Sequence, residues 1–598
     1  MRIAALVKQI PRFETMALGA DGRLERAGIP LELNAYCRRA VSKAVELTAA
    51  DGEVVVFTLG PASADDVLRE AIAWGDRHGS GRIRGVHLCD PAFAGSDTLA
   101  TAKALAAGLE REGRFDLVLC GRNSIDADTG QVGPQLAELL GLPFVGAARQ
   151  LVVDGHTARA RAELDDGWMQ IEARLPAVIA CAERLIEPSK VEPEGRAAVA
   201  ADRIARRRAA EVGAGPWGAA ASPTSVGETR SVAVDRIGHR RADLDLDRQI
   251  DAAFDVLRSN PIEMTSDRPP IDTMALRSPG LRVGAPIVVW CEPGRRSSSA
   301  ELLGAADRLA IATGSEVVAL APNDAANRSL GELGADRVVV FDGEPIERAI
   351  ALASSDWIAR HGATIGLAPS TAWGREVAAR VAVRCDAGLT GDAVDLEIDD
   401  GRLVAWKPAF GGAVVAAIRA SSRLQLVTVR PGVFARPPTR DGGAPTEMRT
   451  LTDDGSVRVL TRERDDDLDE LATARRVIGV GRGVDPERYA DLEPLRSRLG
   501  AEYAATRKVT DAGWMPRARQ LGITGRSIRP ELFVSIGAHG KYNHAVGYRG
   551  AKRVIAINQD ATAPVFDTAD VGIVADWPAA VARLAARSAE LQACLVGR

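Results

Sequence analysis

The sequence predicts an α/β protein made of two related doubly wound α/β domains and a C-terminal Rossmann-like domain. Short apolar, β-branched runs alternate with amphipathic helical segments, as in buried parallel strands joined by helices. One such α/β unit occurs twice, about 250 residues apart. In the last part of the chain, the strand-like runs end at Gly, His, Asn or Asp, and an open α/β sheet binds ligands at these strand ends.

The N-terminal part shows this alternation first. Apolar runs at residues 2–10, 53–61 and 115–121 predict buried strands. Segments with helical apolar spacing lie between them, at residues 34–49, 63–75 and 98–112, and Asn34 is a suitable cap for the first. This order predicts a doubly wound sheet.

A polar, glycine-containing loop, RNSIDADTGQVGP, follows the strand that ends at Gly121 and leads into an amphipathic helix. Backbone N–H groups at the start of such a helix can bind an anion, usually a phosphate. A capped helix with a solvated loop explains the same pattern, and for an isolated loop it is the commoner case. The residues alone leave both interpretations open.

The stretch after residue 364 repeats this order: a strand, a small polar loop, a helix, a short turn and a hairpin. An Asp-Gly turn marks the hairpin in both copies, at Asp154–Gly155 and Asp400–Gly401. Each copy ends in a buried strand, PAVIAC in the first and LQLVTV in the second. We therefore expect two like domains that pack as a pseudo-pair, followed by a third, different domain.

The composition changes between the two copies. A basic helix is predicted from Asp202 onward, and it runs into Gly, Ala, Ser and Pro. Residues 239–261 predict one charged helix, and a proline-rich stretch follows. This whole segment is expected to be a linker or an extended arm. The predicted division is 1–204, 205–283 as the linker or arm, 284–440 and 451–598.

Composition argues against several kinds of partner. The formal net charge is −4, with both signs interspersed, and aromatic residues make up 4% of the chain. A nucleic-acid surface needs a basic face with stacking aromatics, so we expect no nucleic-acid partner. The cluster Arg206–Arg208 is read as a solvated face rather than a binding patch.

Membrane insertion and metal binding are not expected either. No apolar run reaches the roughly 18 residues of a membrane span. The start, MRIAALVKQIP, reads better as a first strand than as a signal peptide. The seven cysteines include no CxxC pair, which disfavours a zinc or iron–sulfur site and a disulfide framework. We expect a reduced, cytoplasmic compartment.

Polar side chains gather after the strand-like runs between residues 477 and 576. Most of them are hydrogen-bond donors, and one is an acid at the end of the stretch. Such a set suits a nucleotide with phosphates and a polar ring. Its members are Arg482, Thr506, Arg507, Thr524, His539, His544, Asn558 and Asp576.

The motifs of this stretch resemble the FAD-binding domain of the electron transfer flavoprotein alpha subunit. The runs VGRGV, TRKVTDAGW, LGITG, GAHGKYNHAVG, AINQD and PVFDTADVGIVAD occur in that family's order. PSTAWGREVAARVA and VTVRPGVF resemble the first domain of the same subunit. LVKQI, ELNAYC, GRNSIDADTGQVGP and LPAVIACAERLIEP resemble the beta subunit. The chain thus looks like a beta–alpha fusion, which would explain the repeat.

The resemblance implies a FAD-containing electron carrier with no catalytic triad and no metal. Arg507 matches the family's arginine beside the flavin ring, Thr524 the threonine that bonds a ring nitrogen, and His544 the histidine at the pyrimidine end, where protonation would stabilise negative charge. Matching positions place these residues around FAD: Phe13, Arg482, Thr506, Arg507, Gln520, Leu521, Gly522, Ile523, Thr524, Gly525, His539, Gly540, Lys541, Asn543, His544, Asn558 and Asp576. Ile523 and His539 depart from the family's usual glutamine and serine.

The beta-like part implies a second nucleotide, AMP or a second FAD. The short loop ADTGQ resembles members in which this site holds a second flavin. The residues expected around it are Leu6, Asn34, Leu59, Gly121, Ile125, Asp126, Asp128, Thr129, Gly130 and Gln131.

The implied partners are a dehydrogenase donor and a quinone-linked acceptor protein, with the fusion acting as a monomer or a homodimer. The loop after IEP lacks the family's anchoring leucine, so the donor is expected to differ from acyl-CoA dehydrogenases. One alternative is an electron-bifurcating enzyme that uses NADH and a second FAD in the beta-like half. Another is a nucleotide-binding module without redox function, for which Ile523 and the altered loop argue.

Overall fold

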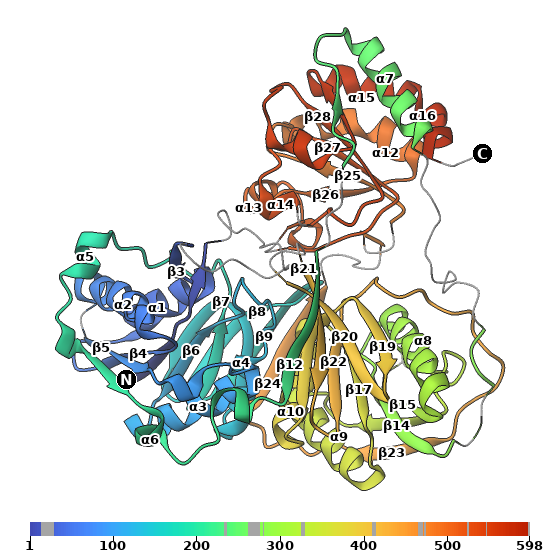
Figure 1. Cartoon of the computed structure of the whole chain (residues 1–598). Coiled ribbons are helices and arrows are strands. Elements are labelled where there is room, and N and C mark those ends of the chain that lie inside the picture. The colour runs from blue at the N-terminus through green and yellow to red at the C-terminus, as the bar shows by residue number, and fades with distance from the viewer. Residues whose placement is uncertain are drawn as a thin grey trace. The chain divides into compact units, whose positions relative to one another are not determined.

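A computed structural model describes the chain at residues 1–12, 29–79, 81–231, 236–260, 275–278, 280, 282–324, 329–409, 414–464, 470–471, 474–522, 525–545 and 547–595. The chain divides into two compact units (Figure 1). Unit 1 comprises Met1–Ser231, Ile271–Phe410 and Val414–Glu463, and unit 2 comprises Val232–Pro270, Gly411–Ala413 and Arg464–Arg598. Phe13, Ile523 and Thr524 lie outside the described residues, as does the side chain of Asn543.

The first sheet of unit 1 has its first seven strands in parallel, and the hairpin of β7, β8 and β9 continues it in antiparallel order. Its central strands are buried on both faces, which explains their β-branched runs. Among the described residues the order is β11 (Ile204–Arg207), β5 (Arg82–Leu88), β4 (Glu53–Leu59), β1 (Arg2–Leu6), β6 (Leu117–Gly121), β10 (Ala177–Cys181), β7 (Phe144–Asp154), β8 (Thr157–Glu163), β9 (Gly167–Arg174) and β24 (Val457–Arg464).

The second sheet of unit 1 is parallel throughout the part of the chain that the structure describes. Its order is β23 (Thr446–Thr450), β16 (Arg337–Asp342), β15 (Ser315–Pro322), β14 (Gly284–Trp290), β17 (Ile365–Pro369), β22 (Gln425–Val429) and β18 (Gly388–Ala393). This order matches the first sheet from β11 to β7, strand for strand in chain sequence. The predicted pair of doubly wound domains is therefore confirmed.

Helices connect the strands of both sheets in equivalent places. In the first they are α1 (Ala35–Leu47), α2 (Asp65–His78), α3 (Thr98–Glu112) and α4 (Val132–Leu139); in the second they are α8 (Arg296–Thr313), α9 (Glu347–His361) and α10 (Ala372–Arg384). Helices α4 and α10 follow equivalent strands and pack together. Between them, the buried Arg380 donates from Nη1 to Glu138 Oε2 over 2.8 Å.

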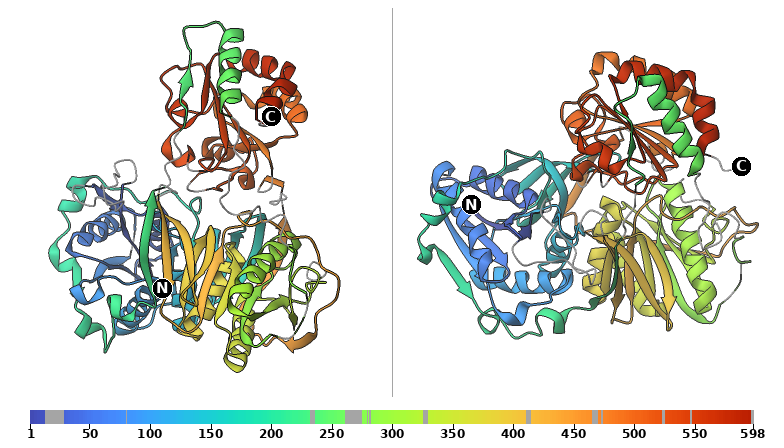
Figure 2. Two further views of the ribbon diagram at one scale, coloured as in Figure 1. Left: turned by 45° about the vertical axis from the view of Figure 1, so that its right-hand side comes forward. Right: turned by 45° about the horizontal axis from the view of Figure 1, so that its top comes forward.

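The two halves of unit 1 exchange strands. Strand β12 (Thr224–Ser231) follows the first half in sequence but pairs with β21 (Val414–Ala420), beside β20 (Arg402–Ala409) and β19 (Asp395–Asp399). In return, β24 follows the second half but forms the outer edge of the first sheet, next to β9. Figure 2 shows β12, in green, lying against the yellow strands of the second half. Each half is completed by a strand of the other.

The predicted basic helix after Asp202 is wrong. Residues 204–207 form β11, which pairs in parallel with the edge of β5, and a short helix, α6 (Ala209–Val212), follows. Arg206 pairs with Asp65, and Arg207 pairs with Glu112 at 3.0 Å. The basic run thus neutralises acids along this edge, in agreement with the predicted solvated face.

Unit 2 contains a parallel sheet with helices around it. Along the described residues its order is β13 (His239–Arg240), β29 (Val571–Val574), β28 (Arg553–Asn558), β27 (Leu532–Ile536), β25 (Arg476–Val480) and β26 (Glu502–Ala505). Apart from β13, the strands follow the doubly wound order 2-1-3-4-5, whose switch point lies between its first and third strands, here β25 and β27. Ligands of such sheets bind outside the carboxyl ends at this point.

Residues 236–260 belong to unit 2, although they precede the second half of unit 1 in sequence. β13 adds a parallel edge to β29, and α7 (Leu246–Ser259) is the charged helix that the sequence predicts. The side-chain amide of Gln249 donates to Val574 O at 3.2 Å and accepts from Val574 N at 2.8 Å, as a neighbouring strand would. Ile250, Phe254 and Leu257 are buried in the unit's core.

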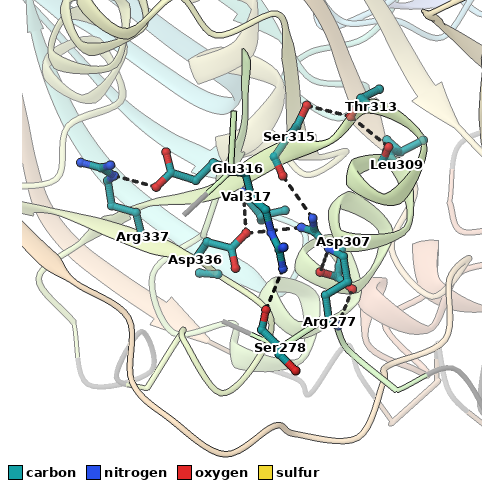
Figure 3. A network of polar contacts seen from close by, with 12 residues as sticks. Arg277, Ser278, Asp307, Leu309, Thr313, Ser315, Glu316, Val317, Asp336 and Arg337 are labelled. Atoms are coloured by element: carbon teal, nitrogen blue, oxygen red, sulfur yellow. Dashed lines mark hydrogen bonds and ion pairs between the residues drawn. The ribbon is translucent and has the colours of Figure 1, made fainter. Parts of the chain in front are cut away.

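Where the chain reaches the second half of unit 1, Arg277 fixes it to α8 and β15 (Figure 3). Its guanidinium donates to Asp307 Oδ1 at 2.7 Å and to Asp336 Oδ2 at 3.3 Å. Asp336 also accepts from Arg440 at 3.2 Å, and both acids are buried. Two arginines thus balance two buried carboxylates and anchor the entry to this domain.

In the part of the chain that the structure describes, no helix has the length and apolar character needed to cross a bilayer. Within the same residues, no group of three or more His, Cys, Asp or Glu side chains is arranged to hold a metal ion.

Candidate functional site

The carboxyl edge of the unit 2 sheet brings together most of the residues predicted to bind the dinucleotide. Arg482 follows β25, Thr506 and Arg507 follow β26, His539 follows β27, Asn558 ends β28, and Asp576 follows β29. Because all five strands run in parallel, their carboxyl ends meet at one edge. The sequence could predict that these residues lie together, because the carboxyl ends of neighbouring parallel strands meet at one edge of the sheet.

At the switch point, the backbone that follows β25 lies close to the backbone that follows β27. Gly483 N donates to Gly537 O at 3.0 Å. A Cβ at Gly481 would lie 2.2 Å from the same carbonyl oxygen, so only glycine permits this approach. Gly540, at φ 79°, is equally restricted, because a Cβ there would lie 2.2 Å from the backbone of Val565. Arg482, His539 and Lys541, which neighbour these glycines in the chain, are exposed.

Arg507 is the first residue of α13 (Arg507–Asp511), and Thr506 occupies the N-cap position, where its hydroxyl makes no capping hydrogen bond. The Arg507 side chain is 44% exposed and pairs with Asp511 through Nε at 3.2 Å. It is therefore a cation at the sheet's carboxyl edge that solvent partly screens.

The loop after α13 is held by Gln520. Its fully buried side-chain carbonyl accepts from Thr510 Oγ1 at 2.7 Å and from Arg517 at 3.0 Å. Its backbone oxygen accepts from Arg526 N at 2.7 Å, which closes the loop that contains Leu521, Gly522 and Gly525. Leu521 N donates to Ala505 O at 2.9 Å, so the loop lies beside the end of β26. Gln520 therefore holds the loop in place through buried hydrogen bonds.

His544, in the short helix α14 (Tyr542–Ala545), contacts the same loop. Its Nδ1 donates to Leu521 O at 3.3 Å, because a carbonyl oxygen can only accept. Its buried Nε2 has no hydrogen-bond partner among the described residues. Burial lowers the pKa of His544 to about 4, so the imidazole is neutral here at pH 7. The predicted positive charge would require a negative group at Nε2.

Asn558 and Asp576 differ in whether their side chains are available to a ligand. The Asn558 amide donates to Ala538 O at 3.0 Å and accepts from Asp560 N at 2.9 Å, so it shapes the loop after β27. Asp576 is exposed at the N-cap of α15 (Trp577–Ala586) and makes no capping hydrogen bond. Asp576 is therefore placed to meet a ligand directly, whereas Asn558 positions its neighbours.

In the first half of unit 1, the predicted second nucleotide residues lie at the carboxyl ends of adjacent strands. Leu6, Leu59 and Gly121 end β1, β4 and β6. The loop from Arg122 to Gln131 follows, and Asn34 holds it by donating to Asn123 O at 2.9 Å and accepting from Ile125 N at 3.3 Å. Asn34 is thus a loop anchor rather than a helix cap, since it makes no capping bond.

The rest of that loop is fixed by contacts that the sequence interpretation did not include. Lys8 pairs with Asp126 at 2.7 Å, and Asn123 donates to Asp128. Gly130 has φ 65°, and Gln131 accepts from Thr98 Oγ1 at 2.7 Å. Thr129 lies beside Gly391 of β18. Lys8 belongs to the run LVKQI, inside the strand predicted at residues 2–10, and the only signal in the sequence was a lysine near the end of that strand.

Comparison with protein families identifies most of the chain. The model described as "Electron transfer flavoprotein domain" matches residues 21–205 and 295–454, more than half of the 598 residues. The model described as "Electron transfer flavoprotein FAD-binding domain" matches residues 470–549, which include the loop of Gln520 and His544. The first model thus matches the two related halves of unit 1, and the second matches unit 2.

Curated relatives of the chain are named Protein FixB. The protein of Clostridium saccharobutylicum is 33% identical over 308 residues, which is 49% of this chain and 92% of the relative. That of Salmonella typhi is 33% identical over 311 residues, covering 50% and 98%, and that of Azorhizobium caulinodans is 35% identical over 296 residues, covering 46% and 80%. Since the family model covers more than half of the chain and the family's FAD-binding domain follows it, the chain belongs to the electron transfer flavoprotein family.

Proposed function

We propose that this protein carries electrons in the cytoplasm from a flavin-containing or other dehydrogenase to a quinone-linked acceptor. The family supports electron transfer, and its FAD-binding domain supports FAD as the cofactor of unit 2. The main support for the proposal is the arrangement of residues at the carboxyl edge of the unit 2 sheet. Glycines and the exposed Arg482, His539 and Lys541 lie at the switch point. His544, which contacts the Gln520 loop beside the end of β26, has a buried nitrogen with no partner among the described residues.

The residues present fit FAD. A dinucleotide's pyrophosphate needs close backbone approach and positive charge, and the glycines near Gly537 provide the first while Arg482, His539 and Lys541 provide the second. The buried Nε2 of His544 needs a polar partner, which the edge of a flavin ring offers. When bound, FAD supplies the reversible acceptance of electrons that a carrier requires.

The chain's own residues position and tune the cofactor in this proposal. Arg507 supplies positive charge near the ring, Thr524 a hydroxyl for a ring nitrogen, and His544 a contact at the pyrimidine end. Arg482, Thr506 and Asp576 hold the ribityl, pyrophosphate and adenosine parts, and Asn558 positions the loop after β27 beside them. The loop that contains Gln520, Leu521 and Gly522 lies along the flavin. His539, Gly540, Lys541 and Asn543 line the loop after β27.

A second nucleotide, AMP or FAD, is proposed at the loop from Ile125 to Gln131 in unit 1. The support is its position at the carboxyl ends of β1 and β6, together with the start of α4. An acid extract of the purified protein separates the possibilities. One FAD plus one AMP per chain is expected of a carrier, and a colourless protein that cannot take up FAD would contradict the proposed function.

An electron-bifurcating enzyme is the second candidate, which the short loop between Ile125 and Gln131 favours. It requires two FAD molecules per chain and reduction by NADH. Flavin counting combined with an NADH titration therefore distinguishes the two functions.

The role of Arg507 can be tested by replacing it. Arg507→Ala should leave FAD bound but lower its one-electron potential, because loss of the cation disfavours the more negative reduced form. A lost interaction of 1.4 kcal/mol corresponds to about 59 mV, and solvent screening should keep the change below that. Arg496→Ala is the matched control, since Arg496 is a partly exposed helix arginine paired with Glu493. Equal potentials in the Arg507 variant and the control would contradict this role.

A further inference from the structure

The two halves of unit 1 have equivalent strand ends that meet a helix start, and in open α/β sheets such strand ends form the crevice where a ligand binds. The first crevice lies at the carboxyl ends of β1 and β6, before α4, and contains the loop from Arg122 to Gln131. The second crevice lies at the carboxyl ends of β14 and β17, before α10. Because the strand orders of the two sheets match, the two helix starts are equivalent positions for an anion.

The second crevice is filled by carboxylates of the protein itself. Asp165, in the turn between β8 and β9 of the first half, accepts from Ala372 N at the start of α10 over 2.7 Å. Its neighbour Asp166 is buried and pairs with Arg295 at 3.0 Å. Glu292 accepts from Thr371 Oγ1 at 2.8 Å in the same place. A carboxylate already occupies the position that an external anion would take.

The first crevice receives basic side chains from the opposite half. Lys407, on β20, donates from Nζ to Ala127 O at 2.7 Å. Arg375, on α10, lies beside Gly130, where a Cβ would be 3.8 Å from its Cδ and 4.0 Å from its Nη1. The acids nearby are Asp128, which pairs with Asn123, and Asp392, which pairs with Arg430 and lies 3.9 Å from Arg375.

A buried amide in the first crevice also needs a ligand. Gln131 occupies the N-cap of α4 and is 1% exposed. Its Nε2 has no hydrogen-bond partner in the part of the chain that the structure describes, and it faces Gly391, where a Cβ would come within 2.9 Å of it. A buried donor in this state is costly unless a ligand or an ordered water satisfies it.

We propose that Lys407 and Arg375 complete an anion site in the first crevice, which takes the phosphate of a nucleotide, while Asp165 closes the equivalent position in the second. Lys407 acts as a positioning residue that holds the loop through Ala127 O and adds positive charge. Each half thereby contributes side chains to the crevice of the other: Lys407 and Arg375 of the second half complete the first crevice, and Asp165 of the first half closes the second. This inference rests on the proposed function only in taking the ligand to be a nucleotide.

The experiment measures AMP binding to the full-length, FAD-loaded protein by calorimetry after removal of bound AMP, at two salt concentrations. Wild type should bind one AMP in unit 1. Lys407→Met should bind AMP about tenfold more weakly, as expected for the loss of one charge-assisted contact, and with less dependence on salt. Lys407→Arg should restore most of the affinity.

Lys103→Met is the matched control. Lys103 also links the two halves, through Asp386 at 2.6 Å, but it lies on α3 and makes that contact away from the loop. Its AMP affinity should equal that of wild type. Arg375→Gln provides an independent variant should Lys407→Met fail to fold, and it should also weaken AMP binding.

Two results would overturn the inference. One is AMP affinity in both Lys407→Met and Arg375→Gln equal to that of the control. The other is binding of two AMP molecules, or of none, by wild type. Each leaves the proposed function in place as long as FAD is bound, whereas a protein that cannot hold FAD would refute the proposed function itself.

Discussion

The buried imidazole of His544 connects the stability of unit 2 to the proposed flavin site. Its Nδ1 donates one hydrogen bond to the Gln520 loop, and its Nε2 is buried. Burial favours the neutral ring, because charging it without a partner costs desolvation free energy. Nε2 of His544 is therefore an acceptor without a partner among the described residues, and a bound ligand can donate a hydrogen bond to it.

His544 should make the FAD-free protein sensitive to acid. Its pKa is lowered from 6.5 to about 4, so the unfolded chain binds the proton first as the pH falls. The stability it provides is complete above pH 6.5 and is lost toward pH 4, with a total of about 3 kcal/mol. Urea unfolding at pH 7 and pH 4.5 should show a smaller loss in His544→Gln than in wild type. An identical loss in both would contradict this assignment.

For the proposed flavin site, sequence patterns could predict where residues lie better than which contacts they make. Arg482, Thr506 and Asp576 follow strands, and parallel strands bring such positions to one edge regardless of detail. The contact between Lys407 and Ala127 joins residues of different halves. It depends on how two sheets pack, which no local pattern encodes.

At the scale of elements, the segment from Arg236 to Asn260 also shows which structures a local sequence pattern can predict and which it cannot. Its apolar spacing predicts α7, because a helix that buries one face has a period near 3.6. Its two-residue strand β13 is too short to leave a pattern. The strand β11 was missed for a related reason: its arginines suit a helix in isolation, but the open edge of β5 offers backbone partners that favour a strand.

Arg236 should be the main anchor of this segment. Its buried guanidinium pairs with Asp570 at 3.0 Å and donates to the carbonyl oxygens of Arg549 and Ala551. Arg236→Met would leave the carboxylate of Asp570 buried without its cation, which should cost about 3 kcal/mol or more of unfolding free energy. Chemical denaturation followed by a probe in unit 2 measures the change.

Arg241→Met is the control for this prediction. Arg241 lies in the same segment and pairs with Asp243 at 2.7 Å, but both side chains are exposed. Its loss should cost less than about 1 kcal/mol. If the two variants are equally stable, the anchoring role of Arg236 is wrong.

At the scale of the whole molecule, the contact between α4 and α10 joins the halves of unit 1 through a buried ionic cluster. Arg380 contacts both Glu138 and Glu376, Arg384 also pairs with Glu138, and Glu347 lies nearby. Burial raises the pKa of Glu376 to about 7, against the lowering effect of Arg380. Arg380 and Arg384 do not compensate fully for the several carboxylates buried around them.

This cluster should make unit 1 less stable as the pH rises. A raised carboxyl pKa means that folding takes up a proton, so the contribution of Glu376 is complete below its ordinary value of 4.5 and is lost up to about pH 7. Glu376→Gln should reduce this loss, as measured by thermal unfolding at pH 5 and pH 7.5. Asp356→Asn, at an exposed pair with Arg360 on α9, should not change it. A slope that is equal in both variants would exclude Glu376 as its source.

The exchange of strands between the halves predicts how the chain can be divided. A cut between Asn260 and Ala275 leaves β12 and α7 on the first fragment and β24 on the second, each of which completes a sheet or core made largely by the other fragment. Co-expressed fragments should therefore purify together as a one-to-one complex that retains FAD. A first fragment shortened before Thr224 lacks β12 and α7, so it should bind the second fragment far more weakly. Two separately folded, non-associating fragments would show that the exchanged strands contribute little to holding the protein together.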